Sequence, residues 1–99
     1  MAEDPLKRIE DIDASLPKLV GEIGDLAFKE GAIPSKYKYL IAMAVDASHG
    51  DIEGVEALGR MAIEAGATKE EIVEAVRVTH FVSGGGGIFI AAKGLKDIL

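Results

Sequence analysis

The sequence predicts an all-α protein, a single-domain bundle of about five to six helices. Apolar residues recur at spacings of three and four, and glycines fall where helices of that period would end. No stretch has the strict alternation of a strand. The 99 residues, 48% of them hydrophobic, suit one domain over residues 1–99. Because a domain of this size has a small core, we expect it to assemble into an oligomer.

The first two predicted helices lie in the N-terminal third of the chain. A short helix opens at Pro5 and runs to about Asp13, and Ser15 opens a second helix. Gly31 suits the left-handed position that ends a helix. The apolar residues of the second helix share one face, and they are Leu16, Leu19, Val20, Ile23, Leu26 and Ala27.

The middle of the chain predicts two more helices. Ser35 is a natural N-cap for a third helix over about residues 35–48. Residues 39–45 are apolar nearly all round, so this helix should lie at the centre. Asp51 can cap a fourth helix over about residues 51–65.

The C-terminal third predicts a fifth and a sixth helix around a glycine run. Thr68 and Glu71 have the spacing of a capping box, the sharpest local signal in the chain. Gly84–Gly87 should form a turn or a close helix contact, and an anion-binding loop is the alternative. In the last helix, Phe89 and Ile90 point away from the main apolar stripe, which predicts a subunit interface.

Charge and composition exclude several functions. The net charge of −6 would repel a nucleic acid backbone. The longest strongly apolar stretch, residues 39–45, is far shorter than the roughly 20 residues of a membrane span, so we expect a soluble, cytoplasmic, unprocessed protein. The sequence has no cysteine, which excludes disulfides and thiol chemistry.

Two histidines are the candidates for proton transfer near neutral pH. His49 lies at a helix end beside carboxylates, where its alternative role is to interact with the helix dipole. His80 shares a face with Ile72 and Val76 and should point inward, where its alternative role is that of a core or interface histidine.

Acidic residues gather around the same helix junction as His49. A divalent metal site is one interpretation of this cluster, but the spacing matches no known metal motif, and acids at a helix start follow from the dipole alone. We therefore expect no metal. The cluster comprises Asp46, Asp51, Glu53 and Glu56, and Glu56 should pair with Arg60 one turn later.

Three segments together resemble the carboxymuconolactone decarboxylase and alkylhydroperoxidase D-like family, with similarity over roughly residues 16–99. They are Leu40–Val45, Ala62–Ile72 and Phe81–Gly86. The resemblance implies an all-helical, alkylhydroperoxidase D-like fold. It also implies homo-oligomers, commonly trimers or hexamers.

The family's motifs are incomplete in this chain. In redox members a Glu, two cysteines and a His stand where this chain has Tyr39, Asp51, Gly54 and Leu58. Cysteine-dependent peroxidase activity is therefore excluded. Decarboxylase members resemble His-Val-Arg-Ala-Ala where this chain reads Leu-Gly-Arg-Met-Ala, and Arg60 is the matching arginine.

Two functions follow from this comparison. The first is an acid/base enzyme or binder of a small anionic metabolite, without a cofactor, decarboxylase-like if it is catalytic. In it His49 or His80 transfers protons and Arg60 grips a carboxylate, with Tyr39 and Asp51 as further binding residues. The alternative is a non-catalytic homo-oligomer that keeps only the fold, its site filled by Tyr39 and Leu58.

Overall fold

The structure, a computed structural model, describes residues 5–99. These residues form five α-helices and no strand, which confirms the all-α prediction. The helices are α1 (Pro5–Ile12), α2 (Leu16–Phe28), α3 (Ser35–Ser48), α4 (Ile52–Glu64) and α5 (Lys69–Leu95).

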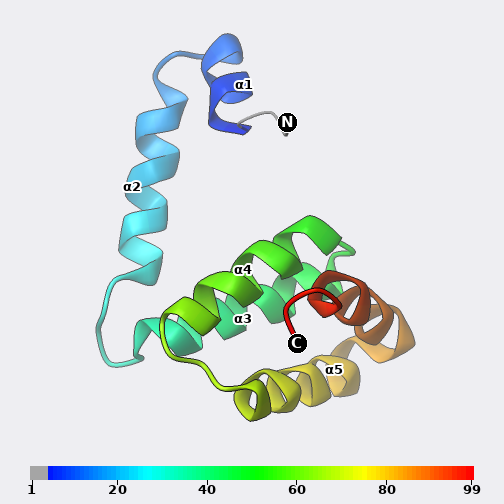
Figure 1. Cartoon of the computed structure of the whole chain (residues 1–99). Coiled ribbons are helices and arrows are strands. Elements are labelled where there is room, and N and C mark those ends of the chain that lie inside the picture. The colour runs from blue at the N-terminus through cyan, green and yellow to red at the C-terminus, as the bar shows by residue number, and fades with distance from the viewer. Residues whose placement is uncertain (1–4) are drawn as a thin grey trace.

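Helices α3, α4 and α5 pack against one another and form the body of the molecule (Figure 1). Met43, Val55 and Ile72 are its largest fully buried side chains, one from each helix. The prediction that α3 lies at the centre holds for one face only. Ile41 and Val45 on its other face are exposed, so the apolar surface of α3 exceeds what α4 and α5 cover.

Gly84 bends α5 into two arms, which correspond to the fifth and sixth predicted helices. Its φ of 70° and ψ of −159° are not helical, and they lie in a region that glycine adopts without steric cost. The predicted turn is therefore confirmed at Gly84, while the rest of the glycine run is helical. In the second arm Phe89 is exposed as expected, but Ile90 packs against the core, because the bend turns its face toward the body.

Helix α5 is the one helix among residues 5–99 that is long and apolar enough to cross a membrane by length and composition alone. Only 17% of its most apolar window is buried. The bend at Gly84 leaves two arms, each shorter than the roughly 20 residues that a span requires.

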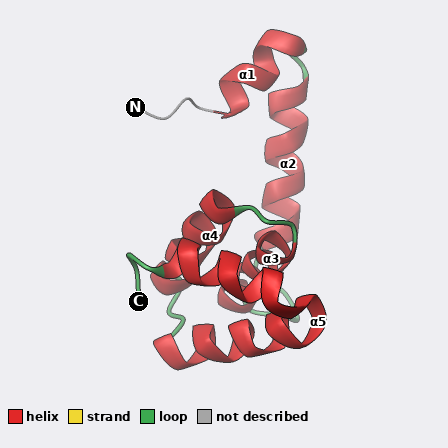
Figure 2. Cartoon of the chain, turned by 90° about the vertical axis from the view of Figure 1, so that its right-hand side faces the viewer, coloured by secondary structure: helices red, strands yellow, loops and turns green. Residues whose placement is uncertain are grey.

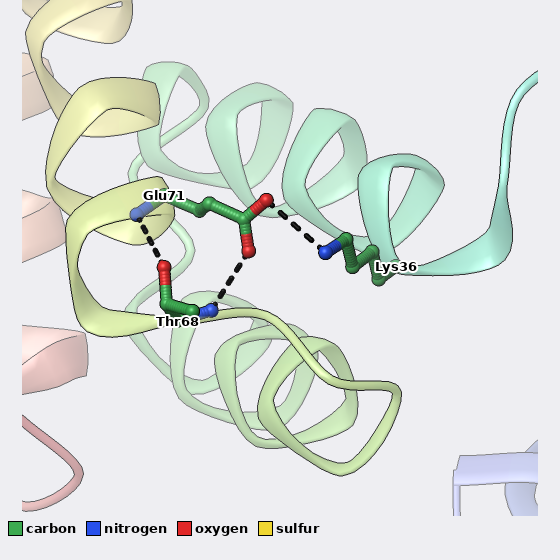
Figure 3. Close-up of polar contacts among 3 residues, drawn as sticks. All are labelled: Lys36, Thr68 and Glu71. Carbon is green, nitrogen blue, oxygen red and sulfur yellow. Dashed lines mark hydrogen bonds and ion pairs between the residues drawn. The ribbon is translucent and has the colours of Figure 1, made fainter.

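The predicted capping box at the start of α5 is confirmed. The Glu71 N–H donates to the Thr68 hydroxyl over 3.1 Å, and the Thr68 N–H donates to the Glu71 carboxylate over 2.9 Å. Lys36 of α3 lies 3.2 Å from the other oxygen of that carboxylate, and Figure 3 shows all three contacts. The Thr68 N–H, followed by Lys36, lowers the pKa of Glu71, and Glu71 raises the pKa of Lys36. The box therefore also ties α5 to α3.

Other helix ends follow the sequence in part. Asp51 caps α4, accepting from the Gly54 N–H over 2.8 Å. Ser35 does not cap α3 as predicted. It is the first residue of the helix, and its hydroxyl donates to the Phe28 carbonyl, which fixes the connection from α2. Gly31 was also predicted wrongly, since it lacks a positive φ and α2 ends earlier, at Phe28.

Helices α1 and α2 form an arm that extends away from the body, as both views show (Figures 1 and 2). The arm meets the body at the C-terminal end of α2, where Phe28 stacks on Tyr39 of α3 with ring centroids 4.8 Å apart. Lys38 also donates to the Lys29 carbonyl over 2.7 Å. No residue of α2 is buried.

Candidate functional site

A pocket of about 510 Å³ lies between the two arms of α5 and the residues that follow them. Apolar side chains form most of its wall. They are Val73 and Val76 from the first arm, and Ile88, Ala91, Ala92, Leu95 and Leu99 from the second arm and the C-terminal residues. A volume of this size accommodates a small organic molecule.

The polar residues that line this pocket are all basic. They are Arg77 and His80 on the first arm and Lys96 beyond the second. None of the three forms an ion pair within residues 5–99, and no Asp or Glu side chain lines the pocket. In a chain with a net charge of −6, this is a local concentration of positive groups against an apolar wall.

The local sequence explains this arrangement. Arg77 and His80 are three residues apart, so they lie on the same side of a helix as Val73 and Val76. The bend at Gly84 then brings the second arm, and with it Lys96, to face them. The pocket exists because one helix is folded back near its own first half.

His80 does not point inward as predicted. It is exposed and lines the pocket, whereas Thr79, its neighbour in the chain, is buried and donates to the Ala75 carbonyl over 2.9 Å. The line from Ile72 through Val76 to His80 turns gradually out of the core, because a helix repeats every 3.6 residues and not every four.

His49 and Asp51 lie at the α3–α4 junction, away from this pocket. His49 is exposed at the C-terminal end of α3, which agrees with its alternative role at the helix dipole. Nearby, burial and then the charge of Asp51 raise the pKa of Asp46, while His49 acts in the opposite direction. A side chain at Gly54 would collide with the Asp46 and Asp51 carboxylates, so both lie close to the start of α4.

Arg60 and Tyr39 line two other hollows. Arg60 lies beside Ile63 and Ile98, and its guanidinium is 3.5 Å from the Glu56 carboxylate, which is the predicted surface pair. Tyr39 lines a hollow where α2 meets the body, its ring against Phe28. The five residues chosen from the sequence are therefore not gathered in one cavity.

Within residues 5–99, no three His, Asp or Glu side chains are grouped as metal ligands would be. The acidic run seen in the sequence is spread along the junction, where Asp51 is occupied as the cap of α4 and Glu56 is paired with Arg60.

Sequence reasoning did not select Arg77 and Lys96. The position of Arg77, three residues before His80, was a signal that the same helix face carries two basic groups. For Lys96 no local signal exists, because its position depends on how sharply Gly84 turns the chain.

Comparison with known proteins agrees with this fold. The model of the carboxymuconolactone decarboxylase family matches residues 14–97. A search of curated proteins found no significant match. Among solved structures, the chain is similar to apo-lpg0406, a carboxymuconolactone decarboxylase family protein from Legionella pneumophila. The two are 25% identical with a TM-score of 0.84, over 92% of this chain and 81% of that one. The chain therefore belongs to the carboxymuconolactone decarboxylase family.

Proposed function

We propose that the protein binds a small anionic metabolite with an apolar body in the α5 pocket, and that His80 is the acid/base group there. The observation that carries this proposal is the set of Arg77, His80 and Lys96 around an otherwise apolar wall. An anion leaving water needs a compensating charge, which a guanidinium or an ammonium supplies. The apolar wall favours the rest of the ligand by burial.

His80 is suited to proton transfer because imidazole changes its charge near neutral pH. In a decarboxylation, the bond to the carboxylate breaks, its electron pair stays on carbon as CO₂ leaves, and that carbon takes up a proton. In this proposal His80 donates the proton, and the supporting observation is that His80 lines the pocket. The roles suggested for His49, Arg60, Tyr39 and Asp51 remain separate hypotheses, since none of these residues lines the pocket.

Calorimetric titration with octanoate and with octanamide tests the binding. The two probes share an apolar chain and differ in charge, so octanoate should bind and octanamide should bind at least about tenfold more weakly. The double variant Arg77→Gln/Lys96→Gln should lose this preference. Lys93→Gln, on the second arm but outside the pocket, is the matched control. Equal affinity for both probes would contradict the proposal.

A second candidate is a homologue without catalysis that keeps the fold and the oligomer. The observation in its favour is that Tyr39 stacks on Phe28 and Leu58 packs against the core, at two positions that carry Glu and His in redox members. Under this hypothesis, His80→Ala would change neither ligand binding nor turnover. In either case we propose a cytoplasmic homo-oligomer, a trimer or a hexamer, that binds neither nucleic acid nor membrane.

A further inference from the structure

The arm of α1 and α2 leaves a large apolar surface uncovered. Leu19, Val20, Ile23 and Leu26 follow one another along α2 at helical spacing, and all four are exposed, Ile23 to 68%. Of the other helices, α2 packs only against α1 and against α3. An amphipathic helix with this stripe is stable in water when the stripe is covered.

The dimensions of the chain agree with a missing partner surface. Its accessible surface is 6780 Å², whereas a compact monomer of 10.4 kDa exposes about 5,400 Å². Its radius of gyration is 14.3 Å, against about 13 Å for a compact domain of this length. The surplus, on the order of 1,000 Å², is comparable to what one partner contributes to a stable protein interface.

A second uncovered apolar surface lies on the body, between α3 and the first arm of α5. A hollow of about 180 Å³ there has no charged residue in its lining. It is lined by the apolar residues Ala44, Val45, Val78 and Val82 and by the hydroxyl residues Ser48, Thr79 and Ser83. Phe81, in the same turn as Val82, is 89% exposed. We call this surface the α3–α5 groove.

We propose that α2 of one copy packs its apolar stripe into the α3–α5 groove of a second copy. Each chain offers one uncovered apolar stripe on α2 and one uncovered groove, and neither the four stripe residues nor the groove lining includes a charged residue. A second copy therefore supplies what each surface lacks. With 13 residues, α2 is about 20 Å long, enough to lie along several turns of α3 and α5. Packing of α2 from each copy onto the groove of another gives a closed assembly, either a two-fold dimer or a ring.

The absence of native cysteine makes this arrangement testable by disulfide trapping in the full chain. Val20→Cys, Ile23→Cys and Leu26→Cys would each be mixed with Val82→Cys and oxidised. At least one mixture should give a linked pair of chains in much higher yield than either variant alone, because the helix and groove come from different copies. Equal yields from the separate variants, or no linked product in any mixture, would overturn the proposal.

Sedimentation of Ile23→Lys provides a second measurement. This change should convert the oligomer to monomer, whereas Glu22→Gln, with the same change of charge off the stripe, should leave it intact. A monomeric native chain, or an oligomer that Ile23→Lys does not alter, would overturn the proposal. So would a monomer that binds vesicles of phosphatidylcholine through α2. This inference rests on the proposed homo-oligomer, which a monomeric native chain would also contradict. The proposed octanoate binding is tested separately, because the groove and the octanoate pocket are lined by different residues.

Discussion

The body, made of α3, α4 and α5, and the N-terminal arm, made of α1 and α2, are built from the same kind of amphipathic helix. They differ in what their apolar residues contact. Ile72 in α5 is completely buried, whereas Ile23 in α2 is mostly exposed. The body therefore buries its apolar residues within one chain, whereas the apolar stripe of the arm is left uncovered by that chain. The contrast shows that an amphipathic pattern predicts burial without showing which chain provides it.

The largest expected difference between the two regions is the effect of removing a buried side chain. Ile72→Ala should lower the free energy of unfolding by about 2–5 kcal/mol, because it leaves a cavity among α3, α4 and α5. Ile23→Ala, in a sample dilute enough to be monomeric, should change it by no more than about 0.5 kcal/mol. Urea unfolding followed by circular dichroism measures both. Similar losses would show that the arm is part of the body's folding unit.

Adding a methyl group should have opposite effects in the two regions. At Gly94 a Cβ would lie 2.5 Å from the Val55 side chain and 2.9 Å from the Ile52 carbonyl, so Gly94→Ala should cost about 1–3 kcal/mol. At Gly21 nothing lies within 4 Å, so Gly21→Ala should stabilise α2 by about 0.5–1 kcal/mol. Thermal unfolding checks the first change, and helicity or hydrogen exchange in α2 checks the second. A destabilised Gly21→Ala would mean that α2 is packed more closely than the structure shows.

Helix capping gives a smaller contrast. Thr68→Ala removes the hydroxyl that accepts from the Glu71 N–H, and should lower the free energy of unfolding by about 1 kcal/mol. Ser15, at the same position before α2, makes no cap contact with its helix and bonds to Asp13 instead. Ser15→Ala should therefore change global unfolding by less than about 0.5 kcal/mol. Equal effects of the two substitutions in chemical denaturation would contradict the division between body and arm.

The sequence predicted the fold largely because its local signals agree with one another. Thr68 with Glu71 and the cap at Asp51 are read from neighbouring residues, and both are present. The errors at Ser35 and Gly31 arose where the arm joins the body, since the Ser35 hydroxyl binds a carbonyl seven residues away.

The pocket could be predicted less well than the fold. The sequence identified His80 as a candidate but placed it in the core, and it missed Lys96, whose position depends on the bend at Gly84. The glycine run shows where the chain bends, but it does not show in which direction the chain turns. The side chains that meet across it are therefore a tertiary property.

The smallest expected effect concerns the pH dependence of stability. Hydrogen bonds lower the pKa of Glu71 below its usual 4.5, so its contribution to stability is present above pH 4.5 and is lost as the pH falls through the lowered value. Asp46 acts in the opposite sense, since its pKa is raised. Asp46 is present in both Glu71→Gln and Asp13→Asn, the two variants compared here, so it does not affect the comparison. Glu71→Gln should weaken the loss of stability in acid.

In the arm, the Ser15 hydroxyl, followed by the Ser15 N–H, lowers the pKa of Asp13 below 3.8. Asp13→Asn is therefore a matched removal of a hydrogen-bonded carboxylate in the other region. It should leave the acid limb of global unfolding unchanged, because the Asp13–Ser15 contact lies outside the packed helices α3, α4 and α5. Urea midpoints measured between pH 3 and 6 for both variants decide the question. If Asp13→Asn weakens the pH dependence of the urea midpoint as much as Glu71→Gln does, the arm and the body unfold as one unit. The difference in their packing would then not extend to their energetics.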